Sequence, residues 1–259
     1  MPLEPDPNGT IFSTASLGVA TVLLALDKDD WWPKKIKERV ASLRDELLGN
    51  EFMETLINSD PFRAIAEELE AFIFTHRVMG YHCTKEQQPG YFEAHGLRVL
   101  RREDHQAEFV QKFGTSFSTE ELAEMQRDWS AYFDGEQDRC RNGRLWLCLA
   151  PDQVVDSGTK QFFAYYGGES VYVPIVQHSA IKEKLRAIGN PVVVEVSIDP
   201  GKLCTFLPVP FALNTLSRFH HRMNPDAHIC SREGYLICPI NPVEIVRVTP
   251  KATFFSTHV

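Results

Sequence analysis

The chain has 259 residues, of which 43% are hydrophobic and 24% are charged, a composition typical of globular proteins and unlike that of disordered chains. Its 27 Lys and Arg against 35 Asp and Glu give a formal net charge of −8, which excludes a protein that coats nucleic acid non-specifically. The 6 cysteines stand singly, without a C-x-x-C pair, so we expect reduced cysteines and a cytoplasmic protein.

The first apolar stretch, Ala15 to Leu26, has 12 residues, whereas a membrane-spanning helix needs about 20. Glu4 and Asp6 precede it without any Lys or Arg, so the positively charged start of a signal peptide is missing. We therefore expect a buried segment here, and no membrane partner.

Two amphipathic helices are predicted in the first third of the chain. The first ends at Gly49-Asn50 and the second begins at Asp60-Pro61, because glycine favours helix ends and proline fits the first helical position. Their apolar stripes are Ile36, Val40, Leu43 and Leu47 in the first helix, and Phe62, Ile65, Leu69, Phe72 and Ile73 in the second. We predict that residues 1–75 form a helical N-terminal extension and that residues 76–259 form the main domain.

From Tyr81 onward the chain changes to short apolar runs separated by Gly, Pro and Asn. One further helix begins at the capping box Ser118-Thr119-Glu120-Glu121 and carries the apolar stripe Leu122, Met125 and Trp129. The predicted strands are Leu97 to Leu100, Leu145 to Leu149, Ser170 to Val176, Val192 to Ile198, Tyr235 to Cys238 and Ile245 to Val248. Loops rather than long helices join these strands, which favours an α+β fold with a largely antiparallel sheet and flanking helices.

Three segments combine polar residues with strand signals, although neither a Walker A loop nor a G-x-G-x-x-G sequence occurs. The first runs from Tyr81 to Lys85, and a helical turn and a strand led by Gly96 would fit the residues after it. In a strand, alternation puts His82 and Thr84 on one face and Cys83 on the other. Taken alone, His82 is typical of a histidine in a protein core.

The second segment extends from Ser157 to Glu169 and holds four aromatic residues that end at Gly167-Gly168. It fits a short packed helix with a glycine C-terminus and, equally, an aromatic platform for a planar ligand. The third segment runs from Ser231 to Ile240 and places Glu233 at the start of an apolar strand. A glutamate at the edge of a strand is most often simply solvated.

The order of the three segments resembles the ADP-ribosyltransferase superfamily. Its H-Y-E pattern has a His followed two residues later by Thr or Ser, then a Tyr in a middle strand and helix, then a Glu that opens a late strand. Tyr81-His82-Cys83-Thr84 looks like the first element, and Gly96-Leu97 resembles the continuation that follows it in the family. Tyr165-Tyr166 is similar to the second element, and Glu233-Gly234-Tyr235 is similar to the third. The resemblance covers residues 78–250.

The resemblance implies an ADP-ribosyltransferase-like split, mostly antiparallel β core and an enzyme that uses NAD as its substrate, without a metal. Glu233 would be catalytic, because its carboxylate would hold the 2-hydroxyl of the nicotinamide ribose while positive charge develops on that sugar. His82 and Thr84 would bind the hydroxyls of the adenosine ribose, and either Tyr165 or Tyr166 would stack on the nicotinamide ring.

The diphosphate of NAD needs cations, and the resemblance suggests Arg98 with Arg101 and Arg102, a run equally typical of a solvated loop. The other basic clusters are Arg139-Cys140-Arg141 with Arg144, and Arg218 to Arg222.

The third segment is most similar to toxins that ADP-ribosylate DNA bases and to their relatives in bacterial defence systems. We therefore expect a toxin or antiviral defence effector whose acceptor is a macromolecule, either nucleic acid or protein. Ser231 stands two residues before Glu233, where transferases that modify arginine carry a carboxylate, so arginine is the less expected acceptor. Such a toxin would need a neutralising antitoxin protein, and residues 1–75 offer a surface where it could dock.

Three other interpretations stay open. The first keeps the fold and makes water the acceptor, which gives an NAD glycohydrolase that depletes NAD. The second is a metal-dependent enzyme that uses His220, His221, His228 and Cys230, although these residues follow no recognisable metal-ligand spacing. The third is an inert binding module in which the helical extension engages a partner.

Overall fold

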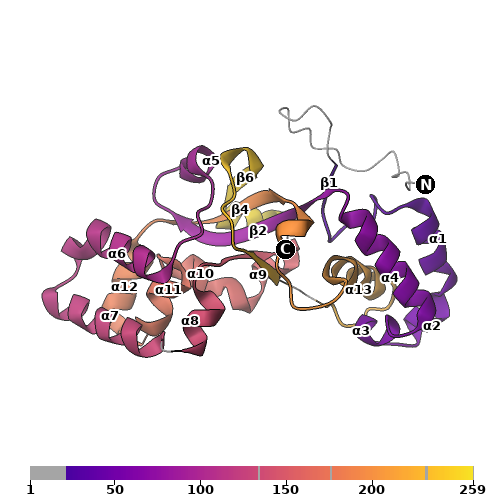
Figure 1. The fold of residues 1–259 in the computed structure, drawn as a ribbon, viewed down its shortest axis with the longest axis horizontal. Helices are drawn as coiled ribbons and strands as arrows, with labels where there is room; N and C mark the ends of the chain where they lie inside the picture. Colours follow the sequence, from indigo (N-terminus) through magenta and orange to yellow (C-terminus); the bar gives the residue numbers. More distant parts are fainter. Residues whose placement is uncertain (1–21, 134, 176, 231–232, 259) are drawn as a thin grey trace. The chain divides into compact units, whose positions relative to one another are not determined.

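A computed structural model describes residues 22–133, 135–175, 177–230 and 233–258 (Figure 1). The chain divides into two compact units. The first unit comprises the residues up to Gly80 together with Cys148–Pro151 and Ser197–Gly234. The second unit comprises Tyr81–Leu147, Asp152–Val196 and the residues from Tyr235 onward.

The described residues form an α+β fold with a mostly antiparallel sheet of six strands, which confirms the predicted class. The strands are β1 (Leu23–Leu24), β2 (Arg77–Glu86), β3 (Leu145–Cys148), β4 (Asn190–Ile198), β5 (Glu233–Leu236) and β6 (Ile245–Pro250). Their order is β5-β3-β2-β4-β6, and β1 pairs with β2 in parallel. Strands β4 and β6 are antiparallel, and the buried carboxylate of Glu195 accepts two hydrogen bonds of 2.9 Å from Arg247 on the opposite strand.

Four of the predicted strands overlap β3, β4, β5 and β6, and two predictions are wrong. In the segment Leu97 to Leu100, only Leu97 pairs, in an isolated bridge to Ile240. The segment Ser170 to Val176 is helical instead, with α11 at Gly168–Tyr172 and a 3-10 turn at Val173–Ile175, while Val176 lies outside the described residues. Its β-branched residues suggested a strand, but the packing of Val171 and Ile175 in a helical core outweighs that preference.

The first unit is largely helical. Its helices are α1 (Lys34–Ser42), α2 (Arg44–Leu48), α3 (Met53–Leu56), α4 (Asp60–Ile73) and α13 (Pro210–Met223). The single helix predicted from residue 36 to 47 is broken at Leu43, where φ is −103° and ψ is 29°, although Ile36, Val40 and Leu47 are buried as expected. The apolar stripe predicted for α4 is buried along its whole length.

Helix α13 packs against α4 and α3, so the N-terminal helices share their core with a late segment of the chain. The indole N–H of Trp32 donates to the hydroxyl of Thr215 on α13 at 3.1 Å. An accessory role for residues 1–75 stays a prediction. Of the stretch Ala15 to Leu26, Leu23, Leu24 and Leu26 are buried, and residues 15–21 lie outside the described part.

The second unit carries most of the shorter helices. They are α5 (Tyr91–His95), α6 (Arg102–Phe113), α7 (Thr119–Tyr132), α8 (Glu136–Arg141), α9 (Pro151–Val155), α10 (Lys160–Ala164), α11, α12 (Ser179–Ala187) and α14 (Lys251–His258). The capping box predicted at Ser118 and Glu121 is present. Met125 and Trp129 of α7 are buried among residues of α6, α11 and α12, with Leu122 packed against them.

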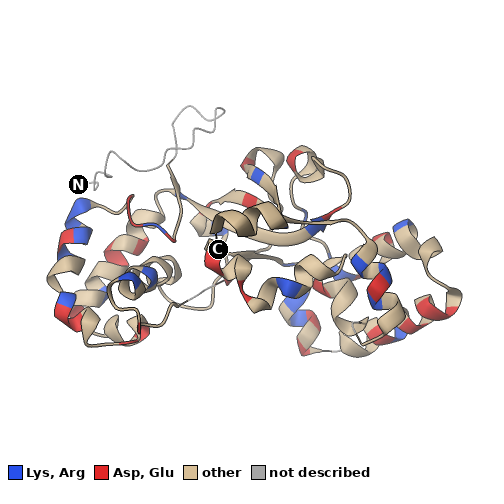
Figure 2. Cartoon of the chain, turned by 180° about the vertical axis from the view of Figure 1, so that it is seen from behind, with Lys and Arg blue, Asp and Glu red and all other residues tan. Residues whose placement is uncertain are grey.

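Among the described helices, none combines the length and the apolar character that a membrane crossing requires. Lys, Arg, Asp and Glu are spread along the helices (Figure 2).

A buried carboxyl caps helix α13 and makes the stability of the first unit depend on pH. The Oε2 atom of Glu70 on α4 accepts a hydrogen bond of 2.6 Å from the backbone N–H of Ala212, in the first turn of α13. Burial raises the pKa of Glu70 from 4.5 to about 7, despite this contact and the one from Phe211. The folded chain therefore binds this proton more tightly than the unfolded chain does.

The contribution of Glu70 to stability is fully present below pH 4.5 and is lost as the pH rises through about 7. We expect Glu70→Gln, which keeps an oxygen acceptor but cannot ionise, to remove this loss of about 3 kcal/mol. The free energy of unfolding in urea, compared between pH 5 and pH 8, measures this loss. Glu67 is exposed on the same helix, so Glu67→Gln is the control. Parallel pH dependence in Glu70→Gln and wild type would contradict this role for Glu70.

Candidate functional site

The second unit contains a cavity of about 330 Å³, a size typical of pockets for small ligands. Its wall is formed by β2, β3, α5, α6 and the turn between α10 and α11. Of the residues expected to form a site, His82, Thr84, Arg98 and Tyr166 line it. Residues from all of these elements thus meet around one space, although they are far apart in the sequence.

Strand β2 presents His82 and Thr84 to the cavity. Both are half-buried, whereas Tyr81 and Cys83 are buried, as the predicted alternation requires. The Nδ1 atom of His82 lies 3.0 Å from the carbonyl oxygen of Trp146 on β3. Because a carbonyl only accepts, Nδ1 carries the proton, and burial lowers the pKa of the ring. His82 is therefore neutral near pH 7, with Nε2 as an acceptor.

The two adjacent tyrosines have different environments. Tyr165 is buried in the helical core, 5.7 Å from Tyr172 between ring centroids, and its hydroxyl accepts a hydrogen bond of 3.1 Å from Arg186. Tyr166 lines the cavity and packs edge-on against Phe113, with centroids 5.1 Å apart. Burial raises the pKa of Tyr166, so its ring is neutral. Only Tyr166 of this pair can contact a ligand in the cavity.

The glycines that follow Tyr166 allow the chain to turn into α11. Gly167 has φ +96° and Gly168 has φ +61°, and both values favour glycine. A Cβ atom at Gly167 would lie 2.7 Å from the Cβ of Val171, one turn further along the helix. The pair Gly167-Gly168 thus lets Tyr166 approach the cavity while Val171 enters the core.

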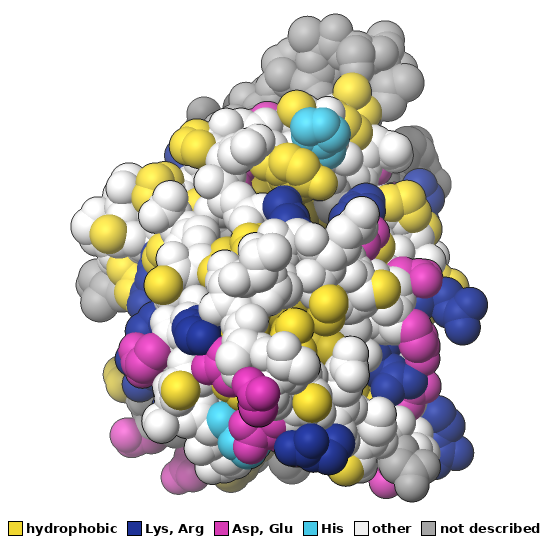
Figure 3. Space-filling view, turned by 90° about the vertical axis from the view of Figure 1, so that its left-hand side faces the viewer, with side chains coloured by type: hydrophobic (Ala, Val, Ile, Leu, Met, Phe, Trp, Pro, Cys, Tyr) yellow, Lys and Arg dark blue, Asp and Glu magenta, His cyan; other side chains and the backbone are white. Residues whose placement is uncertain are grey.

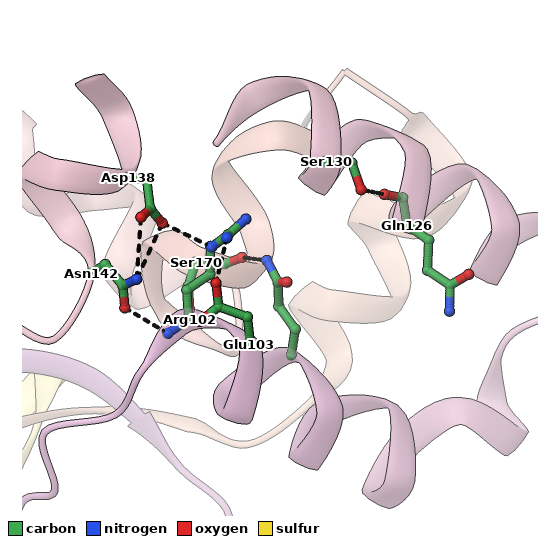
Figure 4. Close-up of polar contacts among 8 residues, drawn as sticks. Arg102, Glu103, Gln126, Ser130, Asp138, Asn142 and Ser170 are labelled. Carbon is green, nitrogen blue, oxygen red and sulfur yellow. Dashed lines mark hydrogen bonds and ion pairs between the residues drawn. The ribbon is translucent and has the colours of Figure 1, made fainter. Parts of the chain in front are cut away.

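Carboxylates neutralise three of the arginines that line the cavity. Arg98 makes two hydrogen bonds to Glu108, of 3.1 and 2.7 Å. Arg102 pairs with Asp138 at 2.9 Å and with Glu103 at 2.5 Å, and its backbone N–H donates to Asn142 (Figure 4). Arg141 pairs with Glu169 at 3.3 Å.

Arg144 is the arginine at the cavity for which the described residues provide no ion pair. Its guanidinium lies over the ring of Tyr235, 4.2 Å from the centroid, and that ring packs against Trp146 at 5.1 Å. Such stacking holds the side chain in place and leaves its N–H donors available.

The lining carries an excess of positive charge, whereas the whole chain has a net charge of −8. Its cations are Lys85, Arg98, Arg102, Lys112, Arg141 and Arg144, and its carboxylates are Glu86, Glu108 and Glu169. On the face drawn in Figure 3, acidic and basic side chains are interspersed, so single-sign charge does not extend over that surface. The cavity is suited to an anionic ligand.

Sequence reasoning missed His105 and Ser170, which also line the cavity. The Nδ1 atom of His105 on α6 lies 2.8 Å from the hydroxyl of Ser170 on α11, and burial lowers the pKa of His105. The neighbouring Gln106 donates to the carbonyl of Ser170 at 2.8 Å. Neither His105 nor Ser170 belongs to a recognisable motif, and the helix α6 that holds His105 was not predicted.

Glu233 begins strand β5 and is not among the described residues that line the cavity. Solvent reaches its side chain, yet the surrounding protein displaces enough water to raise the pKa of its carboxyl. Ser231, two residues earlier, lies outside the described residues.

Two of the histidines considered as metal ligands, His220 and His221, make hydrogen bonds to backbone carbonyls of the first unit. The Nε2 atom of the buried His220 lies 2.7 Å from the carbonyl of Leu47 and 3.0 Å from that of Asn50, so it acts as a donor to α2 and the loop after it. His221 contacts the carbonyl of Ala227 through Nδ1 at 2.7 Å. Within the described residues, no three His, Cys, Asp or Glu side chains come together as a metal site would need.

The basic cluster Arg218 to Arg222 belongs to α13 in the same unit. Arg218 is buried, and Arg222 pairs with Asp29 at 2.9 Å. The carboxylate of Asp29 therefore neutralises the exposed arginine of this cluster.

No family model, curated protein or solved structure matches this chain. The residues that distinguish the cavity are a neutral histidine, an aromatic ring and an excess of cations.

Among the arginines of the cavity, Arg144 should contribute most to the binding of a small anion, because carboxylates neutralise the other three. We expect Arg144→Gln to weaken the binding of inorganic pyrophosphate about tenfold, the size typical of a hydrogen bond to a charged group. Calorimetric titration at low salt measures this effect. Arg63→Gln, which removes an exposed arginine paired with Asp60 in the first unit, is the control. Equal affinities of Arg144→Gln and wild type would show that the anion binds elsewhere.

Proposed function

We propose that this protein is an NAD-dependent ADP-ribosyltransferase that transfers ADP-ribose to a macromolecule. The observation that carries the proposal is the cavity in which His82, Thr84 and Tyr166 stand together with an excess of cations. The order His, Thr, Tyr and a later Glu at position 233 adds the resemblance to the H-Y-E pattern. We also propose that the mostly antiparallel sheet is the split β core typical of ADP-ribosyltransferases.

His82 and Thr84 supply the polar contacts that a ribose needs. The unprotonated Nε2 of His82 accepts a hydrogen bond from a sugar hydroxyl, and the Thr84 hydroxyl can donate or accept beside it. Because His82 is held by the Trp146 carbonyl, its ring does not have to be ordered when the ligand binds.

Tyr166 and Arg144 supply the remaining contacts. A planar nicotinamide ring can stack on the Tyr166 ring, whose edge-on contact with Phe113 fixes its orientation. The diphosphate carries two negative charges and suits Arg144, with the carboxylate-paired Arg98 contributing less. This differs from the expectation from sequence, in which Arg98 was the principal candidate.

The reaction breaks the bond between C1 of the ribose and the nicotinamide nitrogen, and the bonding electrons leave with nicotinamide as a neutral molecule. An acceptor nucleophile then forms a new bond to C1 and loses its proton. Positive charge develops on the sugar between these steps, so a carboxylate beside the ribose stabilises the transition state. Glu233 takes this role in the proposal on the strength of the sequence pattern.

Tyr166 and Tyr165 provide a matched pair for testing the nicotinamide contact. We expect Tyr166→Ala to raise the dissociation constant for NAD about tenfold, because a stacked aromatic contact is lost. Tyr165→Ala removes a core residue, so we expect it to lower the melting temperature instead. Calorimetric titration and thermal unfolding of both variants separate the effects. Equal NAD affinity in Tyr166→Ala and wild type would remove the stacking contact from the proposal.

The reaction itself is tested by incubating the protein with NAD labelled in the adenosine, with and without a cell lysate. We expect label to enter macromolecules, and digestion with nuclease or protease then identifies the acceptor class. Glu233→Gln should lower turnover by about 10²–10³ while NAD still binds, as loss of a transition-state contact requires. Glu244→Gln, at a turn in the second unit, is a control of the same chemistry.

Three results would contradict this proposal. Nicotinamide released equally fast without lysate would make the protein an NAD glycohydrolase. Turnover of Glu233→Gln within tenfold of wild type would remove Glu233 from the site. Absence of NAD binding by the wild-type protein would reject the function as a whole.

A further inference from the structure

Lys85 is a buried lysine at the end of β2, three residues beyond His82, with only 6% of its surface exposed. Its ammonium donates a hydrogen bond of 2.5 Å to the carbonyl of Arg186 and a longer one of 3.4 Å to the carbonyl of Ala164. No carboxylate lies within ion-pair distance of Lys85 among the described residues. Backbone carbonyls alone therefore compensate the buried charge, and burial lowers the pKa of Lys85.

Both carbonyls lie at the C-terminal ends of helices. Ala164 is the last residue of α10, and Arg186 is the next to last residue of α12. The final carbonyls of a helix have no partner within it and carry partial negative charge, so a cation is favoured beside them. One ammonium group thus caps two helices and joins them to the strand that presents His82 and Thr84.

Tyr166 is attached to the same junction. It follows Ala164 by two residues, and its backbone N–H donates to the carbonyl of Leu185 on α12 at 3.2 Å. The position of the Tyr166 ring therefore depends on where the C-terminal ends of α10 and α12 lie. Lys85 joins those two ends to β2, whereas the hydrogen bond from Arg186 to the Tyr165 hydroxyl joins them only to each other.

We propose that Lys85 is a positioning residue, which sets the distance between the Tyr166 ring and the polar face of His82 and Thr84 through the C-terminal ends of α10 and α12. Its effect on NAD affinity rests on the proposed function. Its effect on Tyr166 does not, because that effect concerns the protein without ligand.

The first measurement is hydrogen–deuterium exchange of the free protein, read at the amide of Tyr166. We expect Lys85→Met, which keeps the length of the side chain but removes its donors and charge, to speed this exchange about tenfold. Exchange in α7 should stay unchanged. Lys182→Met is the control, because the Lys182 ammonium lies 5.8 Å from the ring centroid of Tyr165 and contacts the other tyrosine. Lys85→Gln retains neutral donors and serves if Lys85→Met does not fold.

The second measurement is a double-mutant cycle of NAD affinity with Lys85→Met, Tyr166→Ala and the combined variant. If Lys85 acts through Tyr166, its substitution weakens NAD binding about tenfold in the wild-type background and has little effect when Tyr166 is already alanine. A lysine that contacts NAD directly, or that merely stabilises the fold, would give the same loss in both backgrounds.

An unchanged exchange rate at Tyr166 in both Lys85 variants overturns the inference, and so does additivity in the cycle. If the wild-type protein binds no NAD, the proposed function fails, and the exchange rate alone decides the role of Lys85. Faster exchange at Tyr166 then supports the positioning role, and unchanged exchange rejects it.

Discussion

The pleat of strand β2 is the constraint on which the candidate site depends. Because side chains alternate along a strand, His82 and Thr84 share the face of β2 opposite the buried Tyr81 and Cys83, and both line the cavity. The carbonyl of Trp146 on β3 then fixes the His82 ring, and Lys85 at the end of β2 reaches the helices beside Tyr166. A shift of β2 by one residue would bury His82 and Thr84 and expose Cys83. The core and the site are therefore specified by the same register.

The net charge of the whole chain is negative, whereas the residues that line the cavity carry an excess of positive charge. The net charge of −8 disfavours wide contact with a polyanion, but the field inside a cavity depends on the groups that line it. There, carboxylates neutralise Arg98, Arg102 and Arg141, while Arg144 stacks on Tyr235 without an ion pair among the described residues. The arrangement favours an enclosed, small anion over a long one that must lie on the surface.

Local signals in the sequence predicted local structure well and long-range contacts poorly. The alternation in β2, the capping box at Ser118 and the stripe of α4 were correct, because each depends on residues close in sequence. The β-branched run after Gly168 was predicted as a strand, since only its packing in a helical core makes it a helix. The choice between Tyr165 and Tyr166 also needed the structure. So did the contacts of Lys85, whose partners lie 79 and 101 residues away in the chain.

Each of the two units contains a buried ionisable side chain that contacts helix ends: Glu70 in the first unit and Lys85 in the second. Glu70 meets the N–H groups at the start of α13, and Lys85 meets the carbonyls at the ends of α10 and α12, so each charge faces the helix end of opposite sign. Helix ends compensate only part of the cost of removing a charge from water, so burial raises the pKa of Glu70 and lowers that of Lys85. Replacing either group with an apolar residue would leave backbone groups unpaired in the core, whereas ion pairing would need a second buried charge. A single ionisable side chain at each junction provides partners for the helix ends, and the direction of each pKa shift follows from the sign of the buried charge.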